Sequence, residues 1–124
     1  MENLDGLISA VYRSLVAGGS FVFSVEHPIF TAPAEPGWSL NSASRKTWPV
    51  DGYLDEGPRS TDWLTKSVIK QHRTLATYIN MLVRLGFAIG HVEEWGPTRE
   101  QIASNPGWAD EHQRPPFLLM AARR

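Results

Sequence analysis

The order of apolar and polar positions predicts two amphipathic helices. Over residues 4–15 and again over residues 75–85, apolar side chains recur three or four positions apart, which places them on one helical face. Asn3 and Thr74 stand just before these segments, where a side-chain oxygen can cap the first turn. Gly86 follows the second segment, at the place where glycine commonly ends a helix in the left-handed conformation. We therefore expect both helices to pack on a sheet through their apolar faces.

Three buried strands are predicted from shorter apolar runs. Residues 20–26 and 87–95 are rich in aromatic and β-branched side chains, and residues 116–123 contain a continuous apolar run. This near-continuous apolar character indicates strands that are covered on both faces, as in an α/β sheet. A further strand is expected within residues 63–73, where the alternative is the end of a helix. A helix of one or two turns is expected at 98–104.

Residues 28–58, called here the proline-rich segment, have a different character. They hold five of the nine prolines of the chain, which argues against a regular helix and for a long ordered loop. Long loops inside compact domains are uncommon unless they form a lid or a binding surface. Trp38, Trp48 and Tyr53 give this segment more aromatic surface than a solvated linker needs. We expect it to form a long loop or a lid over a binding surface.

Composition narrows the possible classes of protein. Of the 124 residues 42% are hydrophobic and 20% are charged, which is enough apolar material for the core of one domain, residues 1–124. A net charge of -1 argues against nucleic-acid and membrane-surface binding, and the absence of cysteine excludes thiolate metal sites. No membrane span or signal peptide is visible, so we expect a soluble, cytoplasmic protein. Alternating helices and strands indicate an α/β fold.

Candidate chemistry lies near the end of the first predicted strand. His27 follows that strand and could act as a general base, or it could hydrogen-bond the loop backbone. Arg73 could clamp a substrate carboxylate, or it could pair with a neighbouring acidic side chain. Tyr53, His72 and Trp48 could line the same acceptor pocket. We predict His27 as the catalytic residue, and Tyr53, His72, Arg73 and Trp48 as substrate-binding residues.

Two further kinds of site are not expected. His91 and Glu93 could offer a metal only two ligands, without a third at useful spacing. Alternation along this strand would place His91 on the face shared by Phe87 and Ile89. No G-x-G-x-x-G or G-x-x-x-x-G-K motif is present, so the sequence shows no cradle for a dinucleotide or a phosphate.

Three stretches carry a resemblance: LVAGGSFVFSVEHP, HRTLATYINMLVRLGFAIGHVEEW and RPPFLLMAARR. They resemble class I S-adenosylmethionine-dependent methyltransferases of the small-molecule branch. The resemblance runs over nearly the whole chain but only over the C-terminal half of such an enzyme. Ala17 stands where the family usually has proline before Gly-Gly. The glycine-rich loop and the acidic residue that hold the cofactor in that family have no counterpart in this sequence.

The resemblance implies a Rossmann-like half-sheet with packed helices and a long loop. Its three strands would lie in the order 20–26, 116–123 and 87–94, with the last strand of the chain central and antiparallel. The chain would contribute the acceptor-binding side of a methyltransferase that acts on a small molecule. The alternative is a truncated, non-catalytic domain that binds a small ligand or a partner chain.

The same resemblance sets expectations for cofactor and partners. The complete enzyme would use S-adenosylmethionine, but we expect weak or no binding of this cofactor to the chain itself. Strand 20–26 would have an open edge without lysine or proline to protect it, so we expect a homodimer formed through that strand. A small-molecule acceptor is expected, and no nucleic-acid or membrane partner.

Overall fold

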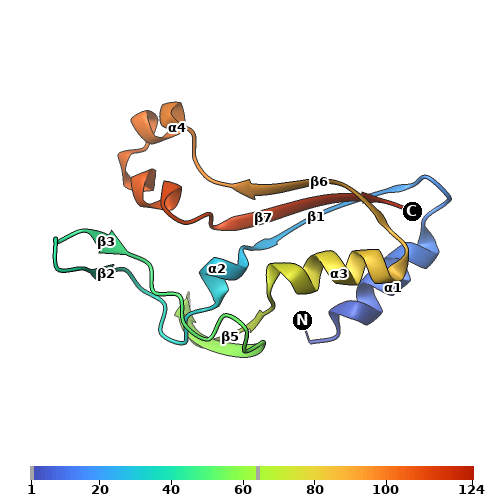
Figure 1. Ribbon diagram of the computed structural model, residues 1–124, viewed down its shortest axis with the longest axis horizontal. Helices are drawn as coiled ribbons and strands as arrows, with labels where there is room; N and C mark the ends of the chain where they lie inside the picture. The colour runs from blue at the N-terminus through green and yellow to red at the C-terminus, as the bar shows by residue number, and fades with distance from the viewer. Residues whose placement is uncertain (1, 64) are drawn as a thin grey trace.

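A computed structural model describes residues 2–63 and 65–124 of the chain (Figure 1). The elements, in chain order, are α1 (Leu4–Ser14), β1 (Ser20–Glu26), α2 (Pro28–Thr31), β2 (Ser39–Leu40), β3 (Lys46–Thr47), β4 (Gly57–Trp63), β5 (Thr65–His72), α3 (Leu75–Leu85), β6 (Ala88–Trp95), α4 (Arg99–Ser104), the 3-10 helix η1 (Pro106–His112) and β7 (Phe117–Arg123). Outside the four consecutive strands β2 to β5, helices and strands alternate, as the sequence predicts for an α/β fold.

The main sheet has the predicted strand order. It runs β1-β7-β6, with β7 in the centre and antiparallel to both neighbours. Phe117, the first residue of β7, pairs with Glu26 at the end of β1 and with Trp95 at the end of β6. The carboxyl ends of β1 and β6 therefore meet at the same edge of the sheet, on either side of the start of β7.

Both long helices lie on one face of this sheet (Figure 1). Asn3 accepts a hydrogen bond from the Gly6 N–H at the start of α1, and Thr74 caps α3 by accepting from the Thr77 N–H. The buried core joins the two helices to β6 and β7; it consists of Ile8, Tyr78, Met81, Leu82, Phe87, Leu118, Met120 and Ala122. Most of the predicted helical faces are confirmed, but Leu7 of α1 and Val83 of α3, which the spacing places inward, are 45% and 58% exposed.

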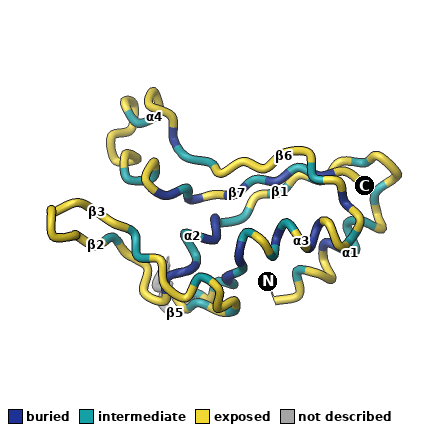
Figure 2. Tube along the Cα trace, in the orientation of Figure 1, coloured by how far each residue is buried: buried dark blue, intermediate teal, exposed yellow. Residues whose placement is uncertain are grey.

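The expectation that both faces of the sheet are covered is wrong for the described residues. In β1 the side chains of Phe21, Phe23 and Val25 pack against the core, whereas the alternate side chains face outward. Val22 is 67% exposed, and the pattern of burial alternates along the whole strand. Figure 2 shows the same alternation along β1. Aromatic and β-branched residues favour strands on exposed and on buried faces alike, so their presence does not indicate that the second face of the sheet is covered.

A bulge in β6 changes which residues share a face. Ile89 pairs with Ala122, but the next paired residue is His91, which lies opposite Ala121, so Gly90 is the extra residue. One inserted residue reverses the alternation of side chains beyond it. His91 is therefore exposed on the face opposite Ile89, and the prediction that placed both on one face is wrong.

The proline-rich segment contains more regular structure than predicted. Its first residues form α2, with Pro28 at the first helical position, where the missing N–H of proline costs nothing. Strands β2 and β3 form a short exposed hairpin that projects from the body (Figure 2). Gly57 and Pro58 already belong to β4, which pairs with β5 in a second hairpin. The strand expected within residues 63–73 is thus confirmed, although residue 64 lies outside the described part.

Across residues 2–63 and 65–124, no helix combines the length and the apolar character that crossing a membrane requires.

Candidate functional site

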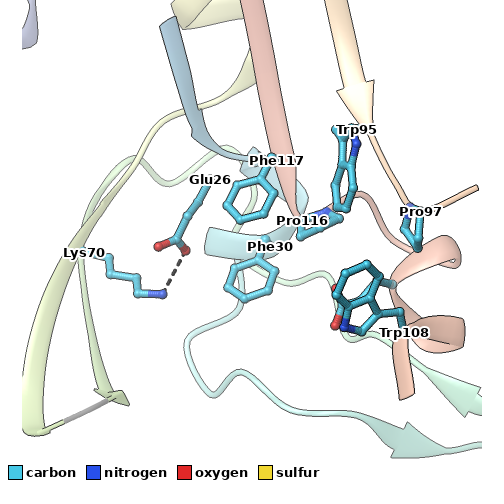
Figure 3. Close-up of a pocket in the computed structure, with 9 residues that line it drawn as sticks. Glu26, Phe30, Lys70, Trp95, Pro97, Trp108, Pro116 and Phe117 are labelled. Atoms are coloured by element: carbon cyan, nitrogen blue, oxygen red, sulfur yellow. Dashed lines mark hydrogen bonds and ion pairs between the residues drawn. The ribbon is translucent and has the colours of Figure 1, made fainter. Parts of the chain in front are cut away.

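An apolar cavity of about 470 Å³ lies where β1 and β6 end. Four aromatic side chains from four different elements line it: Phe30 of α2, Trp95 of β6, Trp108 of η1 and Phe117 of β7 (Figure 3). Pro97 and Pro116 complete the apolar wall. Its volume lies within the range of about 300–1,000 Å³ that is typical of small-molecule sites. Ligands of open α/β sheets bind beyond the carboxyl ends of strands, and this cavity has that position.

The ionic groups at the cavity are paired. Lys70 of β5 donates to Glu26 Oε2 at 2.8 Å, and its Nζ lies 5.1 Å from the centre of the Phe30 ring. Figure 3 shows this ion pair at one side of the cavity. Glu111 of η1 accepts from Arg114 at 2.6 Å. Each carboxylate that lines the cavity is therefore close to a cation.

Arg114 joins the proline-rich segment to the chain just before β7. Its guanidinium carbon lies 4.1 Å from the ring centre of Trp48, 4.4 Å from that of Phe30 and 4.9 Å from that of Trp38. The side chain is 5% exposed, and its Nε has no hydrogen-bond partner among the described residues. Aromatic faces attract cations most strongly when water is excluded, so this contact holds the segment in place.

Trp48, predicted to bind substrate, belongs to this aromatic cluster. Its Nε1–H donates to the carbonyl oxygen of Ile29 at 2.8 Å, and its ring lies 5.6 Å from Phe30 and 5.4 Å from Trp38. Trp48 stands behind Phe30 and is not among the residues that line the cavity. Its substrate contact stays a prediction, and its observed contacts stabilise α2.

His27 is buried and uses both ring nitrogens. Nδ1 accepts a hydrogen bond from the Ile29 N–H at 3.0 Å and so caps α2. An accepting Nδ1 places the ring proton on Nε2, which lies 2.5 Å from Glu94 Oε2. The sequence left open a hydrogen bond from His27 to loop backbone, and the structure contains it. The catalytic role of His27 stays a prediction that requires at least one of these contacts to open.

His72 and Tyr53 are brought together, but they meet inside the protein. His72 is fully buried, with Nδ1 2.7 Å from the Thr31 hydroxyl and Nε2 donating to the Tyr53 carbonyl oxygen at 2.8 Å. The Tyr53 hydroxyl accepts from the Leu75 N–H at 3.1 Å, at the start of α3. These contacts tie the proline-rich segment, including α2, to β5 and α3.

Arg73 lies at a different, more polar hollow of about 290 Å³ beside the start of α1. It donates to the backbone oxygen of Glu2 at 3.1 Å. The structure therefore does not bring His27, Tyr53, His72 and Arg73 around one pocket. His72, in buried contact with Tyr53, lines the same hollow as Arg73, whereas His27 lies under α2 and lines neither that hollow nor the apolar cavity.

Glu56 and Tyr78, near Arg73, have shifted pKa values. Burial alone would raise the pKa of Glu56, but hydrogen bonds from the Thr74 N–H and the Thr77 side chain, with nearby positive charge, hold it below its ordinary value. Burial raises the pKa of Tyr78, and the opposing effect of Arg73 is smaller. Tyr78 belongs to the core, as its place on the helical stripe indicates.

The residues at the cavity were mostly missed by sequence reasoning. Glu26 and Trp95 are the last residues of their strands, so the rule that selected His27 could have selected them as well. Lys70 and Trp108 give no local signal. Within the described ranges no group of three potential metal ligands is found.

Comparisons with known proteins identify the fold. The crystal structure of an S-adenosylmethionine-dependent methyltransferase from Mesorhizobium loti matches with a TM-score of 0.94 and 55% identity, over 100% of this chain and 57% of that one. A Listeria monocytogenes protein assigned to the same class matches with a TM-score of 0.88 and 40% identity, over 100% and 56%. No family model matches the chain.

Two further matches also cover about half of the matched protein. An uncharacterized protein of Haemophilus influenzae is 33% identical over 130 residues, which is 100% of this chain and 49% of that protein. The glycopeptide N-methyltransferase MtfA, complexed with S-adenosyl-L-homocysteine, matches in fold with a TM-score of 0.54 and 18% identity, over 99% of this chain and 48% of MtfA.

The chain is homologous to S-adenosylmethionine-dependent methyltransferases and corresponds to the C-terminal half of their fold. It spans about half the length of the relatives that it matches. The resemblance noted in the sequence is thereby confirmed at the level of the methyltransferase family.

Proposed function

We propose that this chain supplies the acceptor-binding side of an S-adenosylmethionine-dependent methyltransferase that acts on a small molecule. The observation that carries the proposal is the apolar cavity at the carboxyl ends of β1 and β6, in a chain homologous to such enzymes. A concave, mainly apolar site with a few polar groups is the usual form of a small-molecule site.

The described residues do not fit S-adenosylmethionine itself. No glycine-rich turn follows β1 or β6, where the chain continues with His27-Pro28 and Gly96-Pro97. The two carboxylates at the cavity already lie within ion-pair distance of Lys70 and Arg114. We therefore assign the chain no role in holding the cofactor.

The chain's contribution would be to position the acceptor and keep water away. Methyl transfer depends strongly on alignment of the reacting groups, and an apolar wall excludes competing water. Phe30, Trp95 and Trp108 provide that wall, and the contact of Arg114 with the proline-rich segment keeps Phe30 in place. His27 becomes a candidate base only if its bond to Glu94 opens.

A chimera tests the proposal. Residues 1–124 would replace the matching part of the Mesorhizobium loti protein, whose remaining part would supply what this chain lacks. Production of S-adenosylhomocysteine in the presence of candidate acceptors is the expected result. A folded chimera that yields no product, beside a Mesorhizobium loti parent that does, would contradict the proposal.

A non-catalytic ligand-binding domain is the second candidate. The lack of a glycine-rich turn in the sequence favours it for the chain alone. The two functions differ in outcome: the second predicts ligand binding by the chain but no turnover by the chimera.

A further inference from the structure

The lining of the cavity at the ends of β1 and β6 restricts what can bind there. We propose that its ligand is an uncharged, flat aromatic compound that carries a hydroxyl or amino group. This inference rests on the proposed function, since it names the class of methyl acceptor that the site would take.

The first argument is the distribution of aromatic rings. Phe30, Trp95, Trp108 and Phe117 come from four elements and surround one space (Figure 3). The rings of Trp95 and Phe117 lie 6.0 Å apart with 50° between their planes, which leaves ring faces and edges directed at different sides of the cavity. Aromatic rings contact one another best in offset or edge-to-face arrangements. A flat ligand can make both kinds of contact here.

The second argument is the charge balance. Glu26 faces Lys70, and Glu111 faces Arg114, each pair within 2.8 Å. Glu26 and Glu111 of the lining would repel an anionic ligand, and Lys70 would repel a cationic one. A ligand of either charge would also lose its own hydration on entering an apolar cavity. A neutral ligand avoids both costs.

The third argument concerns the polar group on the ligand. A carboxylate has about four lone-pair positions, and the ion pair of Glu26, like that of Glu111, is made through Oε2. Each carboxylate can therefore accept a further hydrogen bond from an O–H or N–H group. Such a group can also accept a methyl group: its oxygen or nitrogen forms the bond to the methyl carbon as the carbon–sulfur bond of the sulfonium donor breaks, and its proton is released.

Binding to the 124-residue chain, without cofactor, tests the proposal. Naphthol at neutral pH is the neutral aromatic probe, and decahydronaphthol is its saturated counterpart with the same hydroxyl group. Naphthoate and phenyltrimethylammonium are the anionic and cationic aromatic probes. We expect naphthol to bind about tenfold more tightly than each of the other three, measured by calorimetry.

Two variants locate the binding. Trp108 is 44% exposed, so its replacement should leave the fold intact, which circular dichroism would verify. Trp108→Ala should weaken naphthol binding about tenfold, whereas Trp108→Phe should restore most of it. Leu54→Ala, at a residue 83% exposed and outside the cavity lining, is the control and should leave binding unchanged.

Several results would overturn the proposal. These are equal binding of naphthol and decahydronaphthol, tighter binding of a charged probe, no binding of any probe, or an unchanged affinity in Trp108→Ala. Because the assay contains no cofactor and measures no turnover, it can fail while the chimera is active. An inactive chimera would likewise leave the binding result standing.

Discussion

Replacing Arg114 with methionine should destabilise the chain and release the proline-rich segment. Methionine has a similar length and is apolar, so the change removes the charge while keeping much of the packing. In the wild type, the Arg114 guanidinium carbon lies 4.1–4.9 Å from three ring centres, and Arg114 Nη1 donates to Glu111. Removing these contacts also leaves the Glu111 carboxylate without its cation.

The expected loss of stability is about 3 kcal/mol. A desolvated cation–π contact contributes on the order of 0.5–2 kcal/mol, and a charged hydrogen bond about 1.5–3 kcal/mol. These contributions are not additive. The variant also gains stability, because it loses the Arg114 Nε, which is buried without a hydrogen-bond partner among the described residues. That relief offsets about 1–3 kcal/mol of the gross loss.

Urea unfolding followed by tryptophan fluorescence measures the effect. We expect a lower midpoint, and a red-shifted native emission because Trp38 and Trp48 become more exposed to water. Arg114→Lys should lose part of the stability, since an ammonium group cannot stack as a guanidinium does. Lys46→Met is the matched control, because the Lys46–Asp110 pair is exposed and should contribute less than about 1 kcal/mol. Wild-type midpoint and emission in Arg114→Met would refute the assignment of Arg114 as the anchor.

Three further outcomes are expected. Titration calorimetry of the chain with S-adenosylmethionine should give weak or no binding, and micromolar affinity would show that the described residues hold the cofactor after all. The chain should self-associate through the edge of β1 that has no strand partner in the described sheet, and light scattering should show less association for Val22→Lys. Glu56→Gln should lower stability by no more than about 1 kcal/mol at neutral pH. Because the pKa of Glu56 is lowered in the folded chain, the contribution of its carboxylate is present above the ordinary glutamate pKa and is lost as the pH falls through the lowered value. Thermal melts of the variant and the wild type should therefore converge in acid; a difference that persists there would contradict the assignment.

The layout of helices and main strands could be predicted from the sequence because its signals are local. Asn3 and Thr74 do cap α1 and α3, and Gly86 does end α3 in the left-handed conformation. The strand order needed more than periodicity, because apolar runs do not say which strands are neighbours. It came from the resemblance to methyltransferases and agrees with the observed register.

The errors arose where one residue changes a pattern. Proline in the segment argues against a regular helix, but Pro28 stands at the first position of α2, where it is compatible with the helix. Regular alternation places His91 on the face of Ile89, but the bulge at Gly90 moves His91 to the opposite face. Neither outcome is visible in composition, since the same residues occur in both local structures.

The candidate site could not be predicted because its residues are adjacent only in the folded chain. His27 and Glu26 are neighbours in sequence, yet His27 turns under α2 to cap it while Glu26 faces the cavity and Lys70. Which of the two side chains meets a ligand depends on the turn that begins at Pro28. That turn is accompanied by a local contact of His27 with Ile29 and a tertiary contact of His27 with Glu94.

Phe30 connects the anchoring of the proline-rich segment with the cavity. The centre of its ring lies 4.4 Å from the Arg114 guanidinium carbon and 5.1 Å from Lys70 Nζ. The same ring lines the cavity. A ligand that stacks on Phe30 would favour the conformation in which that ring is held by Arg114. Coupling free energies are reciprocal, so contacts that stabilise this conformation of the segment also strengthen ligand binding by the same free energy. Arg114, Trp38 and Trp48 are therefore part of the binding site in energetic terms, although of this cluster only Phe30 lines the cavity.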